Sequence, residues 1–106
     1  MQLVIRSRRV PLTPDLQAYC ERSLRFALER FELRLARVSA VLFDVNGPRG
    51  GLDQVCRLLV DIVGGRRLVF ESMEASAFAA VDVAADRARQ TVARELGRWR
   101  WRLAPV

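Results

Sequence analysis

The sequence predicts an α+β fold in which one mixed four-stranded sheet carries both helices on a single face. Two segments repeat apolar residues at steps of three and four, the pattern of helices with one buried side. Four other segments alternate in the way that half-buried strands do. Their order is strand, helix, three strands, helix. Because a crossover through a helix joins parallel strands and hairpins join antiparallel ones, this order favours a mixed sheet.

Residues 1–7 alternate as the first expected strand. A helix is expected to start at Pro14, because Thr13 can accept a bond from a first-turn amide and proline suits the first helical position. Phe26 lies outside the apolar stripe of this helix, and we expect neighbouring side chains to cover it partly. The stripe itself comprises Leu16, Tyr19, Cys20, Ser23, Leu24, Ala27, Leu28 and Phe31.

The next three segments alternate as strands, at residues 37–46, 54–63 and 66–73. The turn-forming residues of segment 46–51 predict a loop between the first two of these strands. Gly64 and Gly65 predict a two-residue hairpin turn with positive φ at both positions. The face of the sheet opposite the helices is then a candidate dimer surface, carrying Val4, Leu42, Val55, Leu59 and Val69.

The last expected helix begins after Ser76 and continues to Arg102. Only Glu95 opposes its basic residues from Arg87 onward. Arg87, Arg94 and Arg98 lie seven and then four residues apart, so they share one side of the helix and suit a line of phosphates. For Trp101, contact with a partner and packing against the sheet edge remain equally open.

Composition favours a nucleic-acid partner. The chain has 106 residues, which fits a single domain at 1–106, and its net charge is +6. All 18 basic residues are arginine, whose planar fork matches phosphate oxygens. The alternative on charge alone is a basic protein without such a partner.

Other function classes have little support. With no histidine and no pair of acids that spacing forces together, the sequence predicts neither an enzyme nor a cofactor. Cys20 and Cys56 lack metal-binding spacing and are expected to be buried thiols. No signal peptide or membrane span is apparent, so we expect a cytoplasmic protein without a membrane partner.

Several motifs resemble those of the ribosome hibernation promoting factor family, also called ribosome-associated inhibitor or sigma-54 modulation proteins. They are the opening MQLVI, the helix start LTPDL followed by Tyr19, the Gly64-Gly65 turn, and FAAVD at 78–82 with Asp86-Arg87. The resemblance covers nearly the whole chain. The chain looks like a short member of the family, without the additional dimerising domain of long members, and like one from a divergent branch. Serine and phenylalanine stand at positions 23 and 26, where lysines are usual in the family.

The resemblance implies binding of the small ribosomal subunit and its rRNA at the decoding region, with inhibition of translation in stationary phase or stress. The resemblance and the charge pattern together name the expected RNA-binding residues as Arg8, Arg9, Arg22, Arg25, Arg87, Arg94, Arg98, Arg100, Trp101 and Arg102. The alternative is an interaction module on the same scaffold that no longer binds ribosomes and forms a homodimer through Leu42, Val55, Leu59 and Val69.

Overall fold

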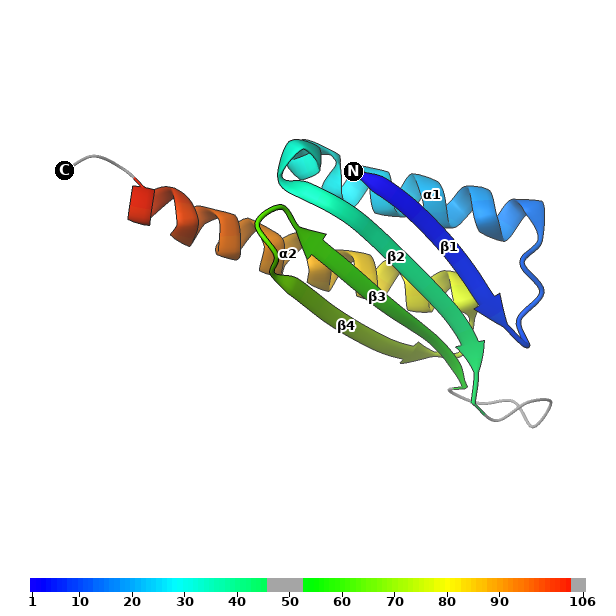
Figure 1. Ribbon diagram of the computed structural model, residues 1–106. Coiled ribbons are helices and arrows are strands. Elements are labelled where there is room, and N and C mark those ends of the chain that lie inside the picture. The colour runs from blue at the N-terminus through cyan, green and yellow to red at the C-terminus, as the bar shows by residue number, and fades with distance from the viewer. Residues whose placement is uncertain (46–52, 104–106) are drawn as a thin grey trace.

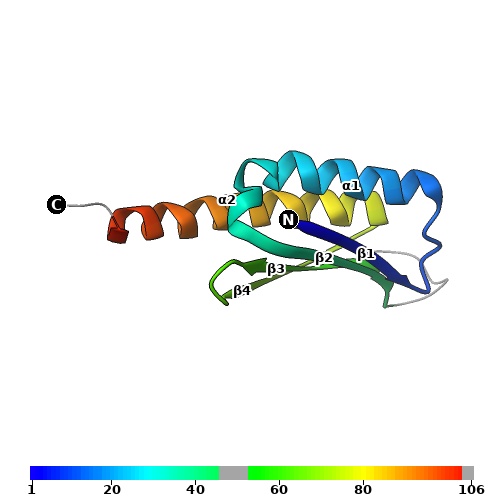
Figure 2. The ribbon, with the colours of Figure 1, turned by 45° about the horizontal axis from the view of Figure 1, so that its top comes forward.

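The computed structural model describes the backbone of residues 1–45 and 53–103 and the side chains as far as Gly97. A four-stranded sheet forms one layer, and two helices cover one of its faces (Figures 1 and 2). The elements in chain order are β1 (Gln2–Arg8), α1 (Pro14–Leu28), the 3₁₀ helix η1 (Glu29–Arg34), β2 (Leu35–Asp44), β3 (Gln54–Ile62), β4 (Arg67–Glu74) and α2 (Ala77–Leu103). The predicted loop at 46–51 lies outside the described residues.

The sheet has the strand order β1-β2-β3-β4. β1 pairs with β2 in parallel, and the two following pairs are antiparallel. The predicted fold class is therefore confirmed. The turn between β3 and β4 has φ of 109° at Gly64 and 104° at Gly65, the conformation that only glycine adopts without strain.

Both helices begin where their capping residues predict. The Thr13 hydroxyl accepts a hydrogen bond from the backbone N–H of Leu16 at 3.2 Å. The Ser76 hydroxyl accepts one from Ala79 at 3.1 Å. The α-helix α1 ends at Leu28, however, and the chain tightens into η1. The apolar stripe did not reveal this change, because Phe31 still packs against the core from η1.

The hydrophobic core lies between the helices and the inner face of the sheet. The largest fully buried side chains include Leu24 and Leu28 of α1, Val81 and Val92 of α2, and Val38, Leu42, Leu58 and Val60 of the sheet. Small residues such as Ala84 and Ala88 on α2 are also fully buried. They allow the backbone of α2 to approach its neighbours closely, and burial of this apolar surface is the main force that holds the layers together.

The structure corrects the predicted face of Leu42. The prediction that Leu42 lies on the outer face is wrong, because Leu42 is fully buried between the sheet and the helices. Both faces of β2 are largely apolar, with Val38, Ala40 and Leu42 inward and Val41 and Phe43 outward. Alternation alone therefore could not show which set faces the helices.

A polar contact joins the two helices beside this core. The Tyr19 hydroxyl donates to the carboxylate of Asp82, with oxygen distances of 2.6 and 2.7 Å. The ring of Tyr19 meets that of Phe78 edge to face, with centroids 5.0 Å apart. These contacts fix the first turns of α2 against the middle of α1.

Tyr19 provides a pH test of this contact. The hydrogen bond to Asp82, followed by lost hydration and the charge of Asp82, raises the pKa of Tyr19 above 10.0. Since this pKa is raised in the folded state, the contact stabilises the protein below pH 10 and is lost as pH rises through the folded-state value. Tyr19 is the single tyrosine of the chain, so its ultraviolet titration is resolved. We expect Asp82→Ala to lower the pH at which half of the Tyr19 hydroxyl is ionised. An unchanged pH of half-ionisation in that variant would contradict the contact between Tyr19 and Asp82.

Candidate nucleic-acid interface

The outer face of the sheet carries a marked excess of positive charge. Leu3 and Ile5 of β1 pack against the core, so the alternate residues of this strand point away from the helices. The same alternation and the strand register place five arginines on the outer face, namely Arg6, Arg8, Arg37, Arg57 and Arg67. Two acids, Asp61 and Glu71, share that face. Counting only residues that the structure describes, this surface therefore has a surplus of three positive charges.

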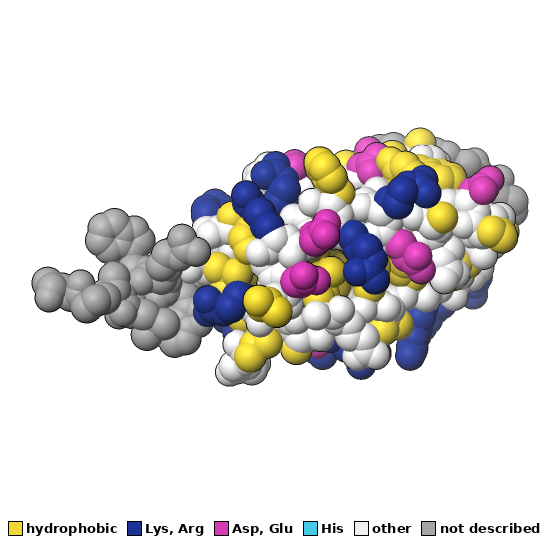
Figure 3. Space-filling model, turned by 90° about the horizontal axis from the view of Figure 1, so that it is seen from above, with side chains coloured by type: hydrophobic (Ala, Val, Ile, Leu, Met, Phe, Trp, Pro, Cys, Tyr) yellow, Lys and Arg dark blue, Asp and Glu magenta, His cyan; other side chains and the backbone are white. Residues whose placement is uncertain are grey.

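The helices have no such surplus in their described part. α1 and η1 together contain four arginines and four acids. From Ala77 to Gly97, α2 contains three of each. In the view from above, dark blue arginine side chains stand beside magenta acidic ones rather than in one block (Figure 3). Among the residues whose side chains the structure describes, the surplus of positive charge thus lies on the outer face of the sheet rather than on the helices.

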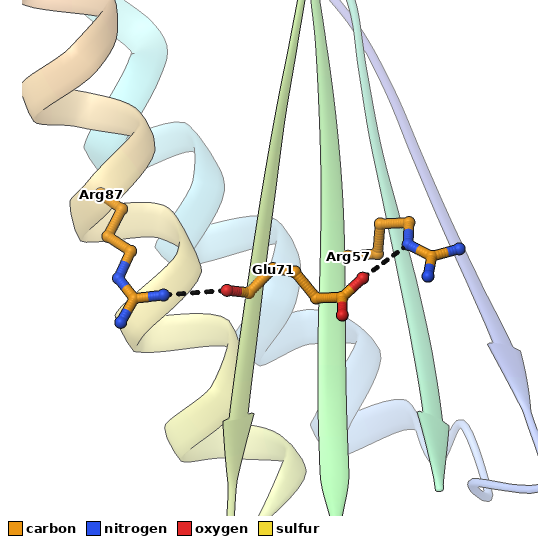
Figure 4. A network of polar contacts seen from close by, with 3 residues as sticks. All are labelled: Arg57, Glu71 and Arg87. Atoms are coloured by element: carbon orange, nitrogen blue, oxygen red, sulfur yellow. Dashed lines mark hydrogen bonds and ion pairs between the residues drawn. The ribbon is translucent and has the colours of Figure 1, made fainter. Parts of the chain in front are cut away.

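A network of three residues connects α2 with the outer face of the sheet (Figure 4). Arg87 of α2 donates to the main-chain carbonyl of Glu71 in β4 at 2.8 Å. The carboxylate of Glu71 in turn accepts a hydrogen bond from Nε of Arg57 in β3, also at 2.8 Å. The Arg57 guanidinium lies 5.3 Å from the centroid of the Phe43 ring. Arg87 is therefore held at the boundary between the helix layer and the basic sheet face.

The other predicted helix arginines with described side chains lie on different helices, two on α1 and one on α2. Arg22 and Arg25 are exposed on α1 and line a hollow with Phe26. Phe26 is 89% exposed, so the expectation that neighbours cover it was wrong. Arg94 is exposed on α2, and its guanidinium lies 3.4 Å from the Thr91 hydroxyl.

Two predicted residues lie near the end of β1, where Arg8 is exposed on the outer face and Arg9 has a φ of 63°. The remaining four, Arg98, Arg100, Trp101 and Arg102, lie on the last turns of α2, and their side chains are outside the described part.

The candidate dimer residues do not form one exposed apolar patch. Leu42 belongs to the core, and Val55 is only 2% exposed, between its strand partners Phe43 and Met73. Leu59 is half-buried and Val69 is 58% exposed. The arginines around them would oppose like charges in a symmetric dimer through this face. The structure thus gives the dimer alternative little support.

Sequence reasoning missed Arg6, Arg37, Arg57 and Arg67 as a group. The four lie on four different strands and meet only through the strand register. The available signal was their position among alternating apolar residues, each on the side opposite the core.

The two cysteines are buried and unbonded to each other. Burial raises the pKa of Cys20 to about 11 and that of Cys56 to about 12, so both thiols stay protonated near neutral pH. Among the described residues, no three or more metal-ligating side chains gather, and no helix is both long and apolar enough to cross a bilayer.

Comparisons with known proteins identify the family by sequence and the fold by structure. The family model described as sigma 54 modulation protein / S30EA ribosomal protein matches residues 3–100. The N-terminal domain of Protein Y from Thermus thermophilus has a similar structure, with a TM-score of 0.72 and 24% identity over 89% of this chain and 98% of that one. A ribosomal subunit interface protein from Coxiella burnetii has a TM-score of 0.75 and 12% identity, covering 92% and 99% respectively. No curated protein sequence matches the chain.

Proposed function

Because the chain belongs to the sigma 54 modulation protein / S30EA ribosomal protein family, we propose that it is a non-catalytic protein that binds the small ribosomal subunit. It occupies the RNA channel of that subunit in the cytoplasm and thereby inhibits translation under stress or in stationary phase. The family match over residues 3–100 is the observation that carries this proposal. The fold is also similar to that of the ribosomal subunit interface protein from Coxiella burnetii.

The charge distribution supports RNA as the direct contact. Phosphate contacts from basic side chains supply nearly all of the non-specific affinity of proteins for nucleic acid and a large share of the specific affinity. The outer sheet face has five arginines against two acids, and Arg87 continues this basic surface onto the flank of α2. The interface proposed here comprises that face, the flank of α2 with Arg94, and the basic end of the helix at Arg98, Arg100, Trp101 and Arg102.

A second, smaller contact is proposed on α1. The Phe26 ring is exposed and lines a hollow together with Arg22, Ser23, Arg25 and Glu29. An exposed ring next to guanidinium groups suits stacking of an unpaired base and contact with its phosphate. Arg8 and Arg9 lie at the far end of the molecule, where β1 leads toward the start of α1. They would extend phosphate contacts to the end of β1 and past it.

Co-sedimentation with small subunits and whole ribosomes tests the proposal. We expect retention at low salt that weakens steeply as salt rises, because each phosphate contact releases counterions. About five contacts imply a roughly 10²-fold lower affinity at 200 mM than at 50 mM salt. A protein that remains at the top of the gradient even at low salt would contradict ribosome binding. Retention that does not change with salt would contradict an interface made of arginines and phosphates.

A further inference from the structure

The outer face of the sheet contains a hollow of about 230 Å³. Three arginines from different strands line it, Arg6 of β1, Arg37 of β2 and Arg67 of β4. Val4, Ser39 and Leu59 contribute apolar and hydroxyl surface to the same hollow. Its volume lies below the roughly 300–1,000 Å³ of typical small-molecule sites. The size therefore favours a small group over a whole nucleotide or cofactor.

Arg37 has a buried donor facing no protein acceptor. Its Nε–H is the one buried side-chain polar atom in the described part of the chain without a hydrogen-bond partner. Buried donors are nearly always satisfied in native proteins, so each exception needs an explanation. A guanidinium can only donate. The group that would satisfy Arg37 must therefore bring an acceptor.

The charges around the hollow favour an anion. Arg67 donates to Asp61 from Nε at 2.6 Å and from Nη2 at 3.2 Å. That hydrogen bond, followed by the charges of Arg67 and Arg37, lowers the pKa of Asp61, so the carboxylate is ionised near neutral pH. Three guanidinium groups against one carboxylate still leave two positive charges. Asp61 also holds Arg67 in place, which reduces the ordering needed when a ligand binds.

We propose that this hollow binds a phosphate group of an RNA backbone, with Arg37 donating from Nε and with Arg6 and Arg67 beside it. The inference rests on the proposed function, because that function brings RNA to the protein. Guanidinium forks match phosphate oxygens in shape and charge. Arg8 lies two residues beyond Arg6 on β1, about 6.6 Å along the strand, and Arg57 lies on the same face. The backbone can therefore continue across the sheet from the hollow.

The first test measures the site without the ribosome. Inorganic phosphate is titrated into the intact protein, and the Nε–H resonances of the arginines are followed by NMR. We expect a saturable shift of the Arg37 resonance and no saturable shift in Arg37→Gln. Arg34→Gln is the matched control, since it removes the same charge from an exposed residue of η1 and should bind phosphate normally. A shift that does not saturate in the wild-type protein indicates an adventitious ion only, and would overturn the site.

The second test uses a short single-stranded RNA and fluorescence anisotropy. Loss of a charge-assisted contact in Arg37→Gln should weaken binding roughly tenfold or more. It should also reduce the slope of log affinity against log salt by about 0.7. Arg37→Lys retains the charge but lacks Nε, so we expect it to restore little of the affinity. Wild-type affinity in Arg37→Lys would show diffuse attraction rather than a built site, and would overturn the proposal.

Co-sedimentation of the same variants separates this inference from the function on which it rests. One outcome is that the wild-type protein and Arg37→Gln bind ribosomes equally well, and that Arg37→Gln changes neither phosphate binding nor RNA binding. In that case the proposed site is wrong and the proposed function stands. If phosphate and RNA bind through Arg37 but the wild-type protein does not bind ribosomes, the site stands and the function is wrong. Weaker ribosome binding in Arg37→Gln than in Arg34→Gln supports both.

Discussion

Replacing Arg87, Arg94 and Arg98 by glutamate together is expected to abolish retention of the protein by ribosomes at physiological salt. A hydrogen bond between charged groups contributes about 1.5–3 kcal/mol. Loss of three such contacts therefore implies at least 10³-fold weaker binding, before the added repulsion between glutamate and phosphate. Co-sedimentation of the variant beside the wild-type protein measures this change. Unchanged retention of a folded triple variant would show that the flank of α2 is outside the interface.

This experiment needs a check of folding because Arg87 also has a structural contact. Its guanidinium donates to the carbonyl of Glu71 at 2.8 Å, and glutamate cannot make that bond. Circular dichroism and thermal unfolding should show a native helix content and a cooperative transition. An Arg94→Glu, Arg98→Glu double variant leaves the contact intact. It should lose a smaller part of the affinity, which separates lost binding from lost packing.

Truncation of Leu42 is expected to cost far more stability than truncation of Leu59. Leu42 is fully buried between sheet and helices, and Leu→Ala at such sites costs about 2–5 kcal/mol. Leu59 is half-buried on the outer face, so less apolar surface is lost there and we expect less than about 1.5 kcal/mol. Denaturant unfolding of Leu42→Ala and Leu59→Ala measures both. Equal losses would contradict the assignment of faces in β2 and β3.

Such a difference would be large for this protein. Domains of this size are commonly stable by about 5–15 kcal/mol in total, so Leu42→Ala removes a substantial share. Where Leu42→Ala does not give folded protein, Leu42→Val offers a milder truncation of the same side chain. The order of the two positions, rather than the absolute values, is what the structure determines.

Local signals in the sequence were enough for the order of the strands and α-helices, although not for the short 3₁₀ helix η1. Thr13, Pro14 and Ser76 mark helix starts by chemistry that acts within one turn. Gly64 and Gly65 define a turn by backbone conformation alone. These effects depend on near neighbours in the chain, so they can be read without knowing the fold. The structure confirmed each of them.

Features that depend on the pairing of strands far apart in the sequence could not be predicted from such local signals. The orientation of β2 depends on which apolar side the helices cover, and Leu42 was assigned to the wrong one. The group of Arg6, Arg37 and Arg67 exists only because three separate strands align in one sheet. The sequence reading identified arginine as the relevant chemistry. Most of the predicted RNA-binding residues lie on the helices. In the described part of the helices, however, the arginines are matched in number by acidic residues.

The contact between Arg87 and Glu71 also has a consequence for self-association. Among the residues that the structure describes, β4 has a strand partner on one side only. An edge of this kind presents unpaired backbone groups that another chain can use to extend the sheet. Arg87 takes up the carbonyl of Glu71 there, and Arg67 and Glu71 add charge along the same strand. A second copy would have to break these contacts before adding a strand. Arg67 and Arg87, which contribute to the basic surface, thus also oppose edge-to-edge pairing along β4.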